Sequence, residues 1–218
     1  MGGRPHHLGT RARQECFVKP IRRGLIPAAG IAVVAILLSA CGGPVAASSA
    51  VIVGEQAVAN TTLDNYVSDL HRALNQPVDQ ADFEAMQAAL NRLILENLID
   101  QSSAKLGIVI TDADIQAAIA TAEASLGGHD QLLAVLLESQ IPPSAINNAF
   151  RLSLTLEKMG PVLVPGTDTK AQQQAVYDYV FQLAAEIGVT PNPRYGTWDA
   201  AQLTLGALPS DLSTPVSK

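Results

Sequence analysis

The sequence predicts a mainly α-helical domain: a small bundle of several helices with a short N-terminal β-hairpin, a long C-terminal helix and an irregular tail. Three observations predict it. Apolar residues recur three or four positions apart in successive segments between residues 62 and 187. Glycine and proline separate those segments. One valine-rich stretch, at residues 51–58, has the composition of strands.

The valine-rich stretch predicts a hairpin. Val51–Val53 forms the first strand, Gly54 and Glu55 form the turn, and Gln56–Val58 returns. Irregular coil is the alternative for so short a piece.

Helix starts are predicted at residues whose side chains can cap free backbone N–H groups. These are Thr62, Asp82, Thr111 or Asp112, and Ser144. Helix ends are predicted at glycine and proline. They fall at Pro77, Gly107, Gly127-Gly128, Pro142-Pro143, Gly160-Pro161 and Gly188. The stretch Val162–Asp168 between the last two helices is predicted to be a hinge, and Val189–Lys218 an extended or irregular tail.

The first forty residues have the layout of a secretory signal peptide: a basic region, then the apolar run Leu25–Leu38, then small residues. The six basic residues are Arg4, Arg11, Arg13, Lys19, Arg22 and Arg23. A transmembrane helix is the first alternative, but the run is shorter than the roughly 20 apolar residues a span requires. An ordinary cleaved signal is the second.

The end of this run, Leu38-Ser39-Ala40-Cys41, resembles a lipobox, the bacterial lipoprotein processing signal. That resemblance implies diacylglycerol transfer to the Cys41 thiol and cleavage between Ala40 and Cys41. The mature bacterial protein is then expected outside the cytoplasm, held at the cell membrane by palmitate-type acyl chains.

The predicted organisation is a signal peptide (1–40), a flexible spacer (41–50), a helical domain (51–160), a hinge (161–168) and a C-terminal helix with a tail packed on that domain (169–218).

Charge and cysteine content argue against several classes of partner and binding site. Residues 41–218 hold 8 Lys and Arg against 19 Asp and Glu, a net charge of −11. Such an acidic domain argues against nucleic acid as a partner, because phosphates require clustered basic residues. The charge is compatible with basic or unfolded polypeptide clients.

Because Cys16 precedes the cleavage point and Cys41 would be acylated, neither a disulfide nor a thiolate zinc site is expected.

Residue patterns that could carry chemistry favour structural roles. Asp112 and Asp114 stand at a predicted helix start, where carboxylates cap and complement the helix dipole. His129 and Asp130 follow a glycine pair, and His71 is expected to face solvent. With no nucleophile elbow and no phosphate-binding loop, we expect no catalytic residues, no metal and no cofactor.

Five of the eight aromatic residues after Cys41 lie between residues 177 and 198. Aromatic side chains dominate many binding surfaces, so four are candidate peptide-binding residues. They are Tyr177, Tyr179, Tyr195 and Trp198. Phe181 is expected in the core. Two alternatives stay open for Tyr195 and Trp198: they fasten the tail to the helical body, or they line a groove.

Several short motifs follow one another along the chain: the Val-Gly-Glu hairpin, Lys105–Ile110 followed by Thr111–Ile115, the Gly127-Gly128 break, the Ile141-Pro142 turn, Arg151-Leu152, and the closing segment Asn192–Asp199. Over about residues 51–160 their order resembles the SurA N-terminal-domain family. The family comprises extracytoplasmic chaperones related to PrsA-type foldases. The resemblance implies a helical client-binding domain. Val162–Asp168 is too short to hold the parvulin domain that the family uses for prolyl isomerisation, so isomerase activity is not expected.

The function expected from the sequence is therefore a membrane-anchored, chaperone-like lipoprotein without catalysis. Its partners would be unfolded or nascent secreted polypeptides and, through lipid on Cys41, the membrane. A scaffold lipoprotein with one dedicated envelope partner is the alternative, and a cell-envelope hydrolase is a second.

Overall fold

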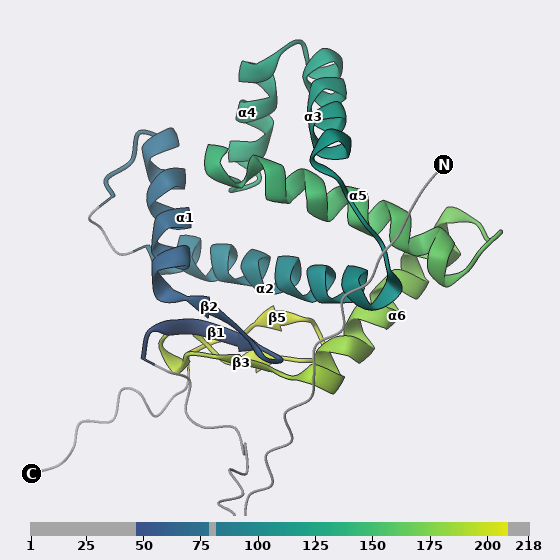
Figure 1. The fold of residues 1–218 in the computed structure, drawn as a ribbon. Helices are drawn as coiled ribbons and strands as arrows, with labels where there is room; N and C mark the ends of the chain where they lie inside the picture. The colour runs from purple at the N-terminus through teal and green to yellow at the C-terminus, as the bar shows by residue number, and fades with distance from the viewer. Residues whose placement is uncertain (1–46, 79–81, 209–218) are drawn as a thin grey trace, which may run out of the picture. The chain divides into compact units, whose positions relative to one another are not determined.

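The computed structural model describes residues 47–78 and 82–208, and within them the predicted mainly α-helical fold is confirmed (Figure 1). The helices are α1 (Asn60–Ala73), α2 (Phe83–Leu106), α3 (Asp112–Leu126), α4 (His129–Glu138), α5 (Ile146–Leu163) and α6 (Thr169–Ile187). The strands are β1 (Ser49–Val53), β2 (Gln56–Ala59), β3 (Val189–Pro191), β4 (Trp198–Asp199) and β5 (Thr204–Leu205). Short 3₁₀ turns occupy Pro143–Ala145 and Pro193–Tyr195. No helix of these residues is long and apolar enough to cross a membrane.

The hairpin belongs to a three-stranded antiparallel sheet with the order β2-β1-β3. Gly54 turns the chain between β1 and β2 with a φ of 62°, a conformation that suits glycine. The strand β3 comes from the tail, which was expected to be irregular, and it pairs Val51 with Pro191 and Val53 with Val189. Ser49 and Ala50, assigned to the spacer in the sequence analysis, are buried in β1.

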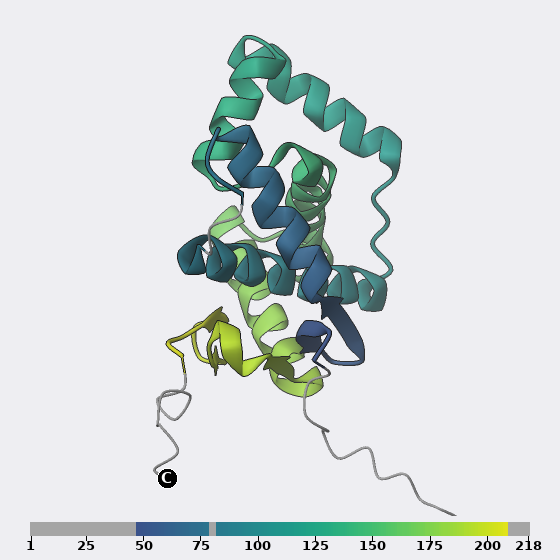
Figure 2. The same cartoon turned by 90° about the vertical axis from the view of Figure 1, so that its left-hand side faces the viewer.

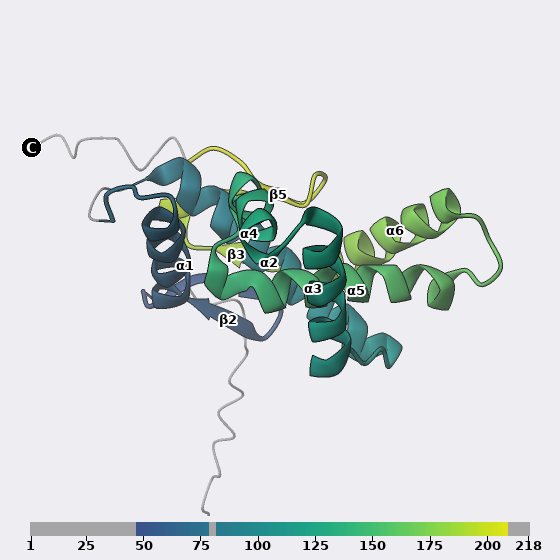
Figure 3. The ribbon, with the colours of Figure 1, turned by 90° about the horizontal axis from the view of Figure 1, so that it is seen from above.

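The helices form layers above this sheet. In Figures 1 and 2, α2 lies over the sheet, α5 lies on the far side of α2, and α3 with α4 lies beyond α5. Helix α1 crosses α2, and α6 packs against both α5 and α2. Seen from above, the end of α5 and the beginning of α6 project past the other helices (Figure 3).

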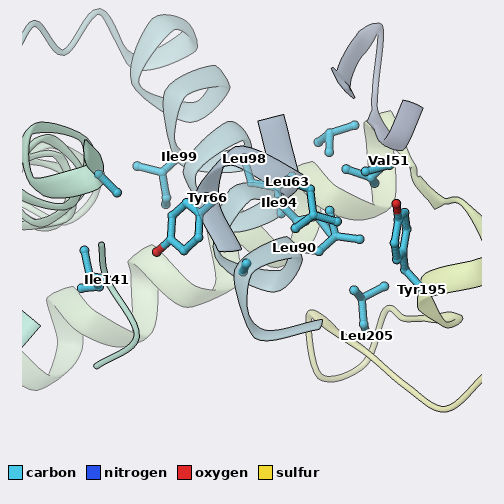
Figure 4. Packing of buried hydrophobic residues seen from close by; sticks show 14 of the residues in the cluster. Val51, Leu63, Tyr66, Leu90, Ile94, Leu98, Ile99, Ile141, Tyr195 and Leu205 are labelled. Atoms are coloured by element: carbon cyan, nitrogen blue, oxygen red, sulfur yellow. The ribbon is translucent and has the colours of Figure 1, made fainter. Parts of the chain in front are cut away.

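Helix α2 occupies the centre of the core. Its buried residues Leu90, Ile94 and Leu98 are fully or almost fully inaccessible (Figure 4). They belong to one cluster with residues of β1, α1 and the tail, among them Val51, Leu63, Tyr66, Tyr195 and Leu205. Since α1, α5, α6 and β1 all pack on α2, this helix positions those four elements relative to one another.

Several predicted caps are confirmed. The Asp82 carboxylate accepts a hydrogen bond from the Ala85 N–H at 2.9 Å, and Thr111 forms a capping box with Asp114. Gly107 ends α2 in the left-handed conformation, and the helices before Gly127 and Gly188 end as expected.

Other local predictions were wrong. Helix α1 begins at Asn60, before Thr62, because β2 runs directly into it. Ser144 caps no helix, since it lies inside the 3₁₀ turn that precedes α5. Helix α5 continues through Pro161 to Leu163, so the proline lies within the helix. His71 is buried, because it continues the core-facing stripe of α1 one turn after Val67, and its Nε2 lies 3.3 Å from Asp82 Oδ2.

Candidate functional site

The end of α5 and the beginning of α6 enclose an open groove of about 420 Å³, which we call groove A. Gly160 allows the two helices to approach closely, because a Cβ atom there would lie only 2.8 Å from Gln172 Cβ. Apolar and amide side chains dominate the lining, which consists of Leu156, Glu157, Gly160, Thr169, Gln172, Gln173 and Val176.

A second open groove, groove B, of about 580 Å³, lies on the other side of α5. Gly107 turns the chain out of α2, and the following residues Ile108 and Val109 cross toward α3. Most of the lining is apolar, and it consists of Leu106, Gly107, Ile108, Val109, Leu154, Glu157, Lys158, Pro161 and Val162. Val109 is 71% exposed and Val162 is 49% exposed, so two large apolar side chains face water here. Both groove volumes lie in the usual range of ligand-binding clefts, about 300–1,000 Å³.

Glu157 lies on the ridge between the grooves and lines both of them. The next residue, Lys158, pairs with other groups. Lys158 Nζ donates a hydrogen bond to the Val109 carbonyl at 3.3 Å and lies 3.6 Å from Asp114 Oδ2. The Thr111 backbone N–H donates to Asp114 Oδ2 at 2.9 Å, and hydrogen bonding by Thr111 holds the pKa of the Asp114 carboxyl below its usual value. Within residues 47–78 and 82–208, Glu157 forms no ion pair.

Pro161 interrupts the backbone hydrogen bonding of α5 at the same ridge. In a regular helix the N–H of residue 161 would donate to the carbonyl of Glu157, four residues earlier, but proline has no N–H. The chain nevertheless stays helical to Leu163. The carbonyl oxygen of Glu157 is thus deprived of its ordinary helical donor where the two grooves meet.

A polar pocket of about 230 Å³ lies elsewhere, between α1, α2 and the start of α5. Tyr66 and Glu96 line it, and Arg92 Nε donates to Glu96 Oε1 at 3.1 Å. Burial raises the pKa of Glu96 despite this ion pair, and burial also raises the pKa of Tyr66 to about 12. The Tyr66 hydroxyl donates to the Gln140 carbonyl at 3.1 Å, so this group joins α1 to the turn after α4. The pocket therefore serves first to join helices.

The four aromatic candidates lie in different surroundings. Tyr195 is only 5% exposed and belongs to the core, and its hydroxyl donates to Asn60 Oδ1 at 3.1 Å. Trp198 and Tyr179 are half-buried against the core. Of the two alternatives for Tyr195, burial favours fastening the tail. For half-buried Trp198 the contact with the core favours the same role.

Tyr177 remains exposed on α6 and stacks with Phe181, their ring centroids 6.2 Å apart. Phe181 was expected in the core and is exposed instead, because Val180 and Leu183 occupy the face of α6 that packs inward. Tyr177 lies one helical turn after Gln173 of groove A, so this aromatic pair extends the same side of α6.

The described residues contain no cluster of three or more His, Cys, Asp and Glu that could hold a metal ion. Their other histidine, His129, pairs on the surface with Glu123, its Nδ1 lying 2.6 Å from Glu123 Oε1. Cys41, Ala40 and the apolar run Leu25–Leu38 lie outside the described residues, so the lipidation and cleavage sites stay predictions.

The two grooves were not predicted from the sequence. Ile108-Val109-Ile110 follows a helix stop and lacks helical or strand periodicity, so its side chains had no predicted face. Two signals were present: three consecutive β-branched apolar residues in a connection, and a proline within an apolar pattern that otherwise continues.

Comparison with known families gives one match. The model of the SurA-like N-terminal domain matches residues 22–160, and no parvulin domain is detected. The searches of curated proteins and of solved structures gave no significant match. The matched domain is not itself catalytic, and its family has a chaperone-like role in general terms. The match covers more than half of the 218 residues and includes the predicted hairpin-and-helix order, so the chain belongs to the SurA-like N-terminal domain family.

Proposed function

We propose that this protein is a membrane-anchored, extracytoplasmic, chaperone-like lipoprotein that binds unfolded or newly translocated polypeptides in grooves A and B. The observation that carries the proposal is the exposure of Val109 and Val162 in groove B, beside a second groove across the same helix. Large apolar side chains gathered in an open groove are typical of interaction sites. Membership of the SurA-like family supports a polypeptide as the occupant.

The mechanism requires no bond to be made or broken. A client places apolar side chains in the grooves, and removal of apolar surface from water stabilises the complex by about 25 cal/mol per Å². Because the grooves are shallow and open, each contact contributes little and the client can leave. Release into water then gives the client another opportunity to fold.

The experiment compares two matched substitutions of exposed valines. Val162→Asp puts a charge in groove B, whereas Val135→Asp puts the same charge on α4, where Val135 is 44% exposed and lines neither groove. Light scattering follows the aggregation of a panel of unfolded proteins. We expect the native protein and Val135→Asp to delay aggregation, and Val162→Asp to lose most of this effect.

Two results would argue against the proposal. If the native protein delays aggregation of no client, the chaperone-like role is wrong. If it protects one client alone, the alternative of a dedicated partner is favoured.

The membrane anchor is a separate part of the proposal, and the lipobox-like sequence ending at Cys41 supports it. Cys41→Ser should remove the acylated N-terminal peptide from the mass spectrum of the protein. Cys16→Ser is the matched control, because Cys16 precedes the proposed cleavage point. A native protein whose N-terminal peptide carries no acyl chain on Cys41 would refute the lipid anchor.

A further inference from the structure

The ridge between grooves A and B carries one carboxylate that forms no ion pair in the described part of the chain. Glu157 lines both grooves, and neither Lys158 nor Lys170 pairs with it in the described part of the chain. Lys158, the one cation in the lining, already lies beside Asp114. The grooves therefore present an uncompensated negative charge between two apolar surfaces.

The described part of the chain is acidic as a whole. The described residues contain seven Lys and Arg against seventeen Asp and Glu. Four of those seven cations already form ion pairs with carboxylates: Arg72, Arg92, Lys105 and Lys158. A negatively charged surface attracts cationic segments and repels acidic ones.

The chemistry of the Glu157 side chain fits a basic ligand. A Lys or Arg head group carries only hydrogen-bond donors, so it complements the acceptor oxygens of the Glu157 carboxylate. The apolar stem of such a side chain suits the apolar walls on either side.

We propose that grooves A and B select polypeptide segments in which a Lys or Arg lies between apolar residues, with the cationic head group on Glu157. This inference rests on the proposed function and specifies the class of client. The apolar residues occupy the grooves on the two sides of α5, and the basic residue crosses the ridge. Acidic segments are excluded by the same carboxylate.

The test uses protein expressed from the full chain and three short synthetic peptides of Leu and Ser that differ only in a central Lys, Gln or Glu. Fluorescence anisotropy measures binding to the native protein, Glu157→Gln, Glu157→Lys and the control Glu138→Gln. Glu138 lies at the end of α4, lines neither groove, and its substitution changes the net charge by the same amount as Glu157→Gln. Circular dichroism verifies that each variant is folded.

We expect the native protein and Glu138→Gln to bind the Lys peptide about two- to fivefold more tightly than the Gln peptide, the range of an ion pair at an exposed site. The preference should disappear in Glu157→Gln, reverse toward the Glu peptide in Glu157→Lys, and weaken as salt is added.

Three other outcomes would each refute a different part of the proposal. Equal binding of all three peptides by the native protein would refute the basic-segment preference and leave the proposed function in place. A preference that survives in Glu157→Gln would refute the role of Glu157. If the native protein binds no peptide, both the proposed function and this inference fail.

Discussion

The two ends of the helical layers use apolar residues in opposite ways. At the sheet end, the tail places Tyr195 and Leu205 in the core, and α2 binds the tail backbone through Gln87 and Asn91. At the groove end, Val109 and Val162 remain in water. At the sheet end the large side chains are therefore buried and stabilise the fold, whereas at the groove end they stay exposed and available for binding. Side-chain burial, rather than residue type, separates a structural region from a binding region here.

Tyr195→Ala tests the sheet end and should have the largest effect. The change empties a core position and leaves Asn60 Oδ1 without its donor. We expect a loss of about 3 to 4 kcal/mol in the free energy of unfolding, measured by urea denaturation. The folded fraction should still bind peptides with native affinity. A large loss of affinity at unchanged stability would instead return Tyr195 to the binding surface.

Gly160→Ala tests the groove end with a smaller effect. The new Cβ would lie 2.8 Å from Gln172 Cβ, so α5 and α6 must separate. Such overpacking costs about 1 to 3 kcal/mol, and the better helix propensity of alanine offsets about 1 kcal/mol of it. We expect weaker peptide binding with a modest loss of stability in thermal unfolding.

A second substitution provides the control for this prediction. Gln172→Gly in the Gly160→Ala background removes the opposing Cβ. Because Gln172 itself lines groove A, the double variant is compared with Gln172→Gly alone, and the two should bind peptides equally well. Weaker binding by the double variant would show that helix separation is not the cause.

Glu96→Gln probes the polar pocket between α1, α2 and the start of α5, and it should have the smallest effect. Burial raises the pKa of Glu96 above its ordinary value of 4.5, so the folded state holds this proton more tightly than the unfolded state. Its ionisation therefore lowers stability as pH rises from 4.5 through the raised pKa. The stability of Glu96→Gln relative to the native protein should increase over that interval. A difference that is flat or falls with pH in urea titrations would contradict this sign.

The sequence predicts local structure well where one residue dictates the geometry. A helix start is fixed by Asp82 and by Thr111, whose side chains accept hydrogen bonds from free backbone N–H groups. A helix end is fixed by Gly107, which adopts the left-handed conformation. These boundaries could therefore be predicted. The pairing of β3 with β1 could not, because its residues are about 140 positions apart and no local pattern encodes the partner.

The candidate site was predicted less well for the same reason. The aromatic residues were recognised as large contact surfaces, but burial of Tyr195 depends on where the tail returns. Grooves A and B arise from segments that meet only in the folded chain, with Val109 and Val162 more than fifty positions apart.

The most direct test of the account is site-specific photo-crosslinking to an unfolded client. A photoreactive amino acid replaces Val162 in groove B or, as the matched position, Val135 on α4. We expect client adducts at position 162 that an apolar peptide with a central Lys competes away, and few adducts at position 135. Equal labelling at both positions, or labelling at 135 alone, would contradict the assignment of client binding to the grooves.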